Sequence, residues 1–87
     1  MESEAKERAE RYIANLRYAF STLKYRDEER SAGLVDLARR YMEDAEYYLH
    51  KGDYLTSIAC SSYAEGLLDA LGRLGMVEVI WPIRRLF

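Results

Sequence analysis

YMEDAEYYLHKGDYLTSIACSSYAEGLLDALGRLG, residues 41–75, is the stretch that decides the fold. Apolar residues recur every three or four positions on both sides of Gly52-Asp53, which is typical of two amphipathic helices. Glycine often supplies the left-handed residue that ends a helix, and aspartate is a favoured N-cap. The dipeptide therefore predicts a tight turn between two antiparallel helices, the second running from about Tyr54 to Leu74.

Two helices are expected before this turn: one that ends at the turn, and one that precedes it along the chain. Residues 26–31 are all polar and predict a connection, with Ser31 as the N-cap of a helix from about Ala32 to Lys51. Before the connection, apolar residues in alternating steps of four and three predict a first helix. It is expected to run from about Ser3, its N-cap, to Tyr25.

The helix after the Gly-Asp turn is apolar over almost half of its circumference. On a helical wheel, the apolar arc holds Leu55, Ala59, Ala70, Tyr63, Leu74, Leu67, Cys60, Leu71 and Ala64. A helix with one neighbour needs only a narrow apolar stripe, whereas a helix between two neighbours needs a wide one. We therefore expect an all-α fold, a three-helix up-and-down bundle in which this arc of the third helix faces both other helices.

The C-terminal residues are expected to form a short extended tail. Residues 76–81 alternate and are rich in β-branched side chains, but one short strand has no sheet to join. We interpret them as a tail packed across the bundle, with Pro82 preventing helix before it and a short turn over residues 83–87. The tail either folds back on its own bundle, which we favour, or is covered by a second chain.

Length and composition exclude several classes of protein. At 87 residues and 10.2 kDa, residues 1–87 are expected to form a single domain. A net charge of −2 with interleaved charges gives no basic patch for nucleic acid. No segment is apolar enough to span a membrane, and the polar start is unlike a signal peptide. With one cysteine, Cys60, we expect a soluble, cytoplasmic protein.

Part of the chain resembles an archaeal family grouped as domain of unknown function 357. The likeness covers residues 41–75 and 77–81. The residues that carry it are Tyr41, Asp44, Ala45, Leu49, Gly52, Asp53, Ala59, Tyr63, Ala64, Gly66, Leu67, Leu68, Asp69, Ala70 and Gly75. The resemblance implies a small three-helix bundle with no assigned activity, and it supplies no catalytic residues. A looser likeness to HEPN ribonucleases lacks their Arg-to-His signature, because no arginine precedes His50 by four to six residues.

An acidic cluster is the candidate polar site. Glu65 and Asp69 are four residues apart in the third helix, near a mid-helix glycine, and Asp44 could join them. Such carboxylates could hold a cation or act as an acid–base pair, although Arg73 is a ready ion-pair partner for Asp69. Gly66 itself is interpreted as part of a shallow groove that receives a tyrosine ring from a neighbouring helix.

Aromatic residues supply the candidate interface. Tyr12, Tyr41, Tyr48 and Tyr63 are expected on buried stripes. The residues expected at an interface are Tyr18, Tyr25, Tyr47, Trp81 and Phe87.

Two functions follow from these features. We expect a non-enzymatic interaction module that binds a protein partner or associates with itself, for example as a dimer, without a metal or cofactor. The alternative is a small-molecule or metal-binding helical domain built on Asp44, Glu65 and Asp69.

Overall fold

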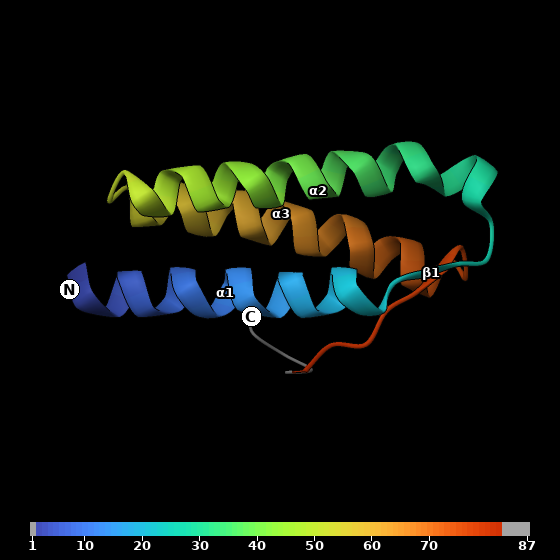
Figure 1. Cartoon of the computed structure of the whole chain (residues 1–87), viewed down its shortest axis with the longest axis horizontal. Coiled ribbons are helices and arrows are strands. Elements are labelled where there is room, and N and C mark those ends of the chain that lie inside the picture. The colour runs from blue at the N-terminus through green and yellow to red at the C-terminus, as the bar shows by residue number, and fades with distance from the viewer. Residues whose placement is uncertain (1, 83–87) are drawn as a thin grey trace.

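The computed structural model describes residues 2–82 and confirms the three-helix bundle (Figure 1). Three long helices run up and down, and two short strands pair beside them. The elements are α1 (Glu2–Thr22), β1 (Lys24–Tyr25), α2 (Glu28–His50), α3 (Tyr54–Arg73) and β2 (Val77–Glu78). α3 packs against both α1 and α2 more extensively than these two pack against each other, so it is the central helix as expected.

The turn between α2 and α3 forms as predicted. Gly52 has a φ of 80°, in the left-handed region that glycine adopts without strain. The Asp53 carboxylate accepts a hydrogen bond from the Thr56 backbone N–H at 3.2 Å, which caps α3. Because this connection is short, α2 and α3 lie antiparallel, and α1 runs parallel to α3.

The start of α2 differs from the prediction. The N-cap is Asp27, whose carboxylate accepts from the Arg30 N–H at 3.2 Å, so the polar segment is the first turn of the helix. Glu28 and Glu29 suit this turn because the helix dipole favours negative charge there. Ser31 was predicted to be the cap but is buried inside α2, where its hydroxyl donates to the Asp27 carbonyl at 2.6 Å.

The first helix also has different ends from those expected. α1 already includes Glu2 and Ser3, so Ser3 is not its N-cap, and α1 ends at Thr22. Lys24 and Tyr25, which were predicted to be helical, form strand β1 instead.

The tail pairs with a second strand, contrary to the prediction that it has no sheet to join. β1 and β2 pair antiparallel, with Tyr25 opposite Val77. Beside this pair, the N–H groups of Arg26 and Asp27 both donate to the Met76 carbonyl, at 2.9 and 3.0 Å. The prediction failed because the extended residues that follow α1 lie at the same end of the bundle as those that follow α3. Each segment therefore supplies the other's missing strand partner.

The tail then packs on its own bundle, as favoured above. Val77 is buried, and Val79 and Trp81 pack against the core residues of the helices. The Ile80 N–H donates to Thr22 Oγ1 at 2.9 Å, which fixes the tail to the end of α1. The turn predicted over residues 83–87 lies outside the described residues.

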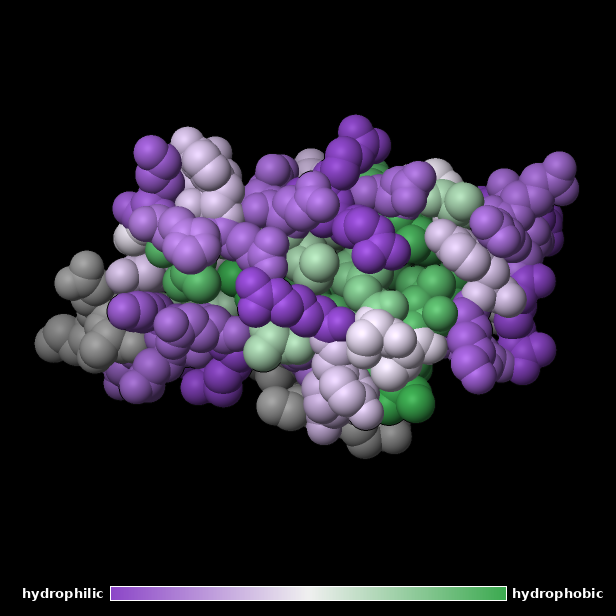
Figure 2. All heavy atoms as spheres, viewed as in Figure 1, coloured by the Kyte–Doolittle hydropathy of each residue, from purple (hydrophilic) through white to green (hydrophobic). Residues whose placement is uncertain are grey.

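The core joins all three helices and the tail. Its members are Leu16, Ala19, Val35, Ala38, Ala64, Leu68, Leu71 and Val77. Figure 2 shows apolar residues reaching the surface along the seam between α1 and α2, with hydrophilic residues on the outer edges of both helices. Polar groups bridge this seam, where Arg17 pairs with Glu46 and the Arg39 guanidinium lies 4.5 Å from the centre of the Phe20 ring.

Candidate functional site

The outer face of α3 carries the two most exposed large apolar side chains among residues 2–82. Leu55 is 76% exposed and Leu74, the C-cap that follows the helix, is 68% exposed, while Tyr63 between them is 49% exposed. Ala59, Gly66 and Ala70 are also exposed and lie between them on the same side of the helix. We call these six residues the α3 outer row. The prediction that the whole apolar arc of this helix faces its neighbours, with Tyr63 buried, was therefore wrong.

The buried side of α3 is centred on different residues. Ser57, Ser61, Ala64, Leu68 and Leu71 are the residues of this helix that are buried. The Ser57 hydroxyl donates to the Ala45 carbonyl of α2 at 2.7 Å, whereas the Ser61 hydroxyl has no hydrogen-bond partner within the described residues. Because the buried side includes these two serines, it is offset from the centre of the apolar arc.

α2 continues the apolar surface beside the outer row. The Tyr41 and Tyr63 rings pack with their centres 4.4 Å apart, so Tyr63 is held from the side of α2. Tyr41 and Tyr48 are only half-buried, and Leu34 is 44% exposed. Since α2 and α3 are antiparallel and Tyr41 meets Tyr63, Leu34 lies level with Ala70. The exposed apolar surface therefore extends across both helices.

Gly66 lies in the middle of the outer row and has nothing packed on it. No heavy atom outside its own helical turn lies within 4 Å of the place where a Cβ would stand. The predicted groove for a tyrosine ring from a neighbouring helix is thus empty within this chain. A glycine in mid-helix destabilises the helix by about 1 kcal/mol relative to alanine. No packing contact within the chain offsets this loss.

The acidic candidates do not come together. Asp44 lies close enough to Cys60 to act on its thiol, whereas Asp69 lines the pocket between α3 and the tail. The Asp69 carboxylate accepts from Arg73 Nε at 2.9 Å, which confirms the ion pair expected from their spacing. Across residues 2–82, no group of three or more His, Cys, Asp or Glu side chains could hold a metal ion. The geometry therefore gives the acidic site no support.

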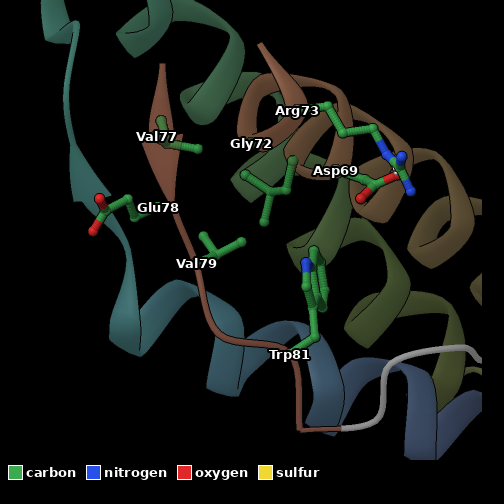
Figure 3. Close-up of a pocket in the computed structure, with 8 residues that line it drawn as sticks. Asp69, Gly72, Arg73, Val77, Glu78, Val79 and Trp81 are labelled. Carbon is green, nitrogen blue, oxygen red and sulfur yellow. Dashed lines mark hydrogen bonds and ion pairs between the residues drawn. The ribbon is translucent and has the colours of Figure 1, made fainter. Parts of the chain in front are cut away.

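A pocket of about 390 Å³ opens between α3 and the tail (Figure 3). Its apolar wall includes Leu68, Val77 and Val79, and the Trp81 ring stands at one side and points toward Asp69. The charged groups around it are already engaged, because Asp69 pairs with Arg73 and Glu78 pairs with Arg26. The pocket thus offers an aromatic ring and a shallow apolar wall without a free charge to orient a ligand.

The residues predicted for an interface lie far apart on the bundle. Tyr18, Tyr25 and Tyr47 are 47%, 36% and 55% exposed. However, Tyr47 is in the last turn of α2 and Tyr25 precedes its first turn, so roughly 30 Å of helix separates them. Trp81 packs on the core of its own chain, and Phe87 lies outside the described residues.

Cys60 lies at the border between the inner and outer sides of α3. It is half-buried, and burial together with the carboxylates of Asp44 and Asp53 raises the pKa of its thiol. Both causes disfavour the thiolate, which is the reactive form of cysteine. This environment is therefore typical of an unreactive thiol, although Cys60 is less buried than a core residue.

A family model described as "Protein of unknown function (DUF357)" matches residues 11–77 of the chain. The chain belongs to the DUF357 family. This membership confirms the resemblance, and the match extends it through most of α1 and the whole of α2 and α3. No curated protein and no solved structure matches the chain significantly. Among residues 2–82, no helix is long and apolar enough to cross a membrane.

Family membership by itself assigns no activity. The α3 outer row was not predicted from the sequence, although the width of the apolar arc indicated it. An apolar arc that covers almost half of a helix exceeds what two neighbours in so small a bundle can bury.

Proposed function

We propose that this DUF357 protein is a non-enzymatic interaction module that binds a protein surface through the outer face of α3. The observation that supports the proposal is the exposure of Leu55, Tyr63 and Leu74 along one side of one helix. Scattered exposed leucines are ordinary on protein surfaces, but a continuous apolar face is typical of an interaction site.

The composition of this face favours a protein partner. The outer row contains no charged residue, so it offers little to phosphate groups or to a charged metabolite. Tyrosine is enriched among the residues that contribute most to binding energy at interfaces. Its ring supplies a large contact area, and its hydroxyl can hydrogen-bond to water at the edge of the interface. Tyr63 is at the middle of the row and is held by Tyr41, so little side-chain freedom is lost when it is covered.

Site-specific photo-crosslinking tests this proposal. A benzophenone side chain is placed at position 63 and, as a matched control, at position 18 of α1, because the two tyrosines are 49% and 47% exposed. In extract of the native host, covalent protein adducts are expected from position 63 and not from position 18. A Leu55→Asp substitution in the position-63 variant should abolish them.

Two results would contradict the proposal. Adducts of equal yield from both positions would indicate non-specific contact, and adducts that persist after Leu55→Asp would show that the outer row does not bind the partner. Circular dichroism of each variant checks that the bundle is folded, which is expected because the substituted side chains are exposed.

A further inference from the structure

We infer that the partner of the α3 outer row is a second copy of this chain, bound through antiparallel pairing of the two α3 helices. This inference rests on the proposed function and names the partner of that same surface. Along α3 the row reads Leu55, Ala59, Tyr63, Gly66, Ala70 and Leu74. Its steps are four, four, three, four and four residues, so the spacing is the same in both directions.

This palindromic spacing makes the row complementary to itself. When a second α3 is laid antiparallel over the first, Leu55 meets Leu74, Ala59 meets Ala70, and Tyr63 meets Gly66. Each of the three contacts occurs twice, as the two-fold axis of a dimer requires. A shallow crossing angle of about 20°, one of the preferred classes of helix packing, keeps the two helices in contact along the whole row.

Side-chain size fits the same arrangement. The largest residue in the middle of the row, Tyr63, comes opposite the smallest, Gly66. The space over Gly66 is open in the single chain, and the facing alanines allow the two backbones to approach closely. A second copy thus supplies the tyrosine ring that the empty groove lacks, and it gives the mid-helix glycine a function in packing.

Charge favours this partner as well. The row is uncharged, so it meets itself without repulsion.

The available area matches that of a small stable dimer. The 20 residues of α3 are about 30 Å long, and α3 with its α2 flank is about 20 Å wide, a flat area of about 600 Å². Stable complexes bury about 800 Å² of accessible surface per partner, and accessible surface exceeds the flat area that it covers. Exposed Leu34 of α2 lies at the side of this face and adds to the area.

The first test is the mass of the full chain in solution. Sedimentation equilibrium from micromolar to millimolar concentration should give twice the 10.2-kDa chain mass at the upper end. Leu55→Asp and Leu74→Asp should each weaken the dimer about 100-fold or more, since each change acts twice. Tyr18→Asp, on α1, should leave the mass unchanged. A wild-type chain that stays monomeric throughout would overturn the inference.

The second test is the register. In a Cys60→Ser background, the double variant Ala59→Cys, Ala70→Cys should form intermolecular disulfides under oxidation, because positions 59 and 70 face each other. Either single cysteine should not, since its own copy in the second chain is about 16 Å away. Efficient crosslinking of a single variant, or failure of the double variant in a chain that dimerises, would overturn the antiparallel pairing.

These outcomes separate the inference from the proposed function. A monomeric chain that still gives Leu55-dependent photo-adducts with a different protein would refute the dimer and leave the interaction module standing. A dimer that is unaffected by both Leu55→Asp and Leu74→Asp would refute this surface for self-association. Absence of adducts from position 63, including those between two copies, would count against both.

Discussion

The two sides of α3 contrast in a way that partly reverses the usual distribution of residues. The inner side, which is buried, includes Ser57 and Ser61 beside the core residues Leu68 and Leu71. The outer side, which is exposed, includes Leu55 and Leu74. An ordinary amphipathic helix has leucines inside and serines outside. The reversal teaches that α3 is built for close packing on its inner side and retains apolar surface for contact on its outer side.

The largest difference between the two sides is expected for leucine. Leu68→Ala on the inner side should lower the free energy of unfolding by about 3 kcal/mol, because Leu68 is completely buried in the core and the change leaves a cavity. Leu55→Ala on the outer side should change it by less than about 0.5 kcal/mol in the monomer. Urea unfolding at low protein concentration measures both. Equal costs would show that the outer side is packed in the monomer.

The two inner serines should differ from each other. Ser57→Ala removes the hydrogen bond to the Ala45 carbonyl and should cost about 1 kcal/mol. Ser61→Ala should be neutral or slightly stabilising, because the Ser61 hydroxyl is buried without a partner in the described structure. Thermal unfolding of the two variants compares them directly. A larger loss for Ser61→Ala than for Ser57→Ala would contradict the assignment of the inner hydrogen bond.

Gly66→Ala separates the requirements of the monomer from those of the dimer. The new methyl group meets no other part of the chain, and alanine favours helix, so the monomer should gain up to about 1 kcal/mol. The same change should weaken self-association, because the methyl group enters the space meant for Tyr63 of the second copy. Unfolding at low concentration and sedimentation at high concentration provide the two readings. A variant that strengthens both would argue against the Tyr63–Gly66 contact.

The smallest expected effect concerns Cys60, at the border of the two sides. Because its thiol pKa is raised, alkylation by iodoacetamide near pH 8 should be slower than for an exposed cysteine. Raising the pH increases the thiolate fraction and hence the rate. Asp44→Asn removes one cause of the shift and should accelerate alkylation by less than tenfold, whereas Asp36→Asn, an exposed control on α2, should not. A rate that is unchanged by Asp44→Asn would exclude that charge as a cause.

Several features of the fold could be predicted from local sequence because their physical cause is local. Gly52 and Asp53 define the α2–α3 turn through one left-handed residue and one cap, and both act within a few residues. Asp69 and Arg73 pair because four residues separate them on one helix. The start of α2 was missed although its cause is also local, since Asp27 and Ser31 are both good caps and the sequence does not rank them.

Other features depend on contacts between distant segments. β1 and β2 are too short to be recognised separately, and their pairing depends on the ends of α1 and α3 meeting at one end of the bundle. Asp44 lies on α2, whereas Glu65 and Asp69 lie on α3. The sequence does not show which side of α3 faces Asp44, and in the structure Glu65 and Asp69 are turned away from it. The candidate polar site was therefore proposed from residues that the fold does not bring together.

The sequence by itself determined three helices, their up-and-down order and the tight turn between the last two, because periodicity, capping and glycine act over short distances. Only the tertiary structure decided which side of α3 is inside. When apolar residues cover almost half of a helix, their periodicity does not show which part of that arc is buried. The side that is buried combines small residues, Ser57, Ser61 and Ala64, with the large Leu68 and Leu71, and such mixed sizes allow side chains of packed helices to interdigitate. The leucines and the tyrosine of the outer row consequently remain exposed.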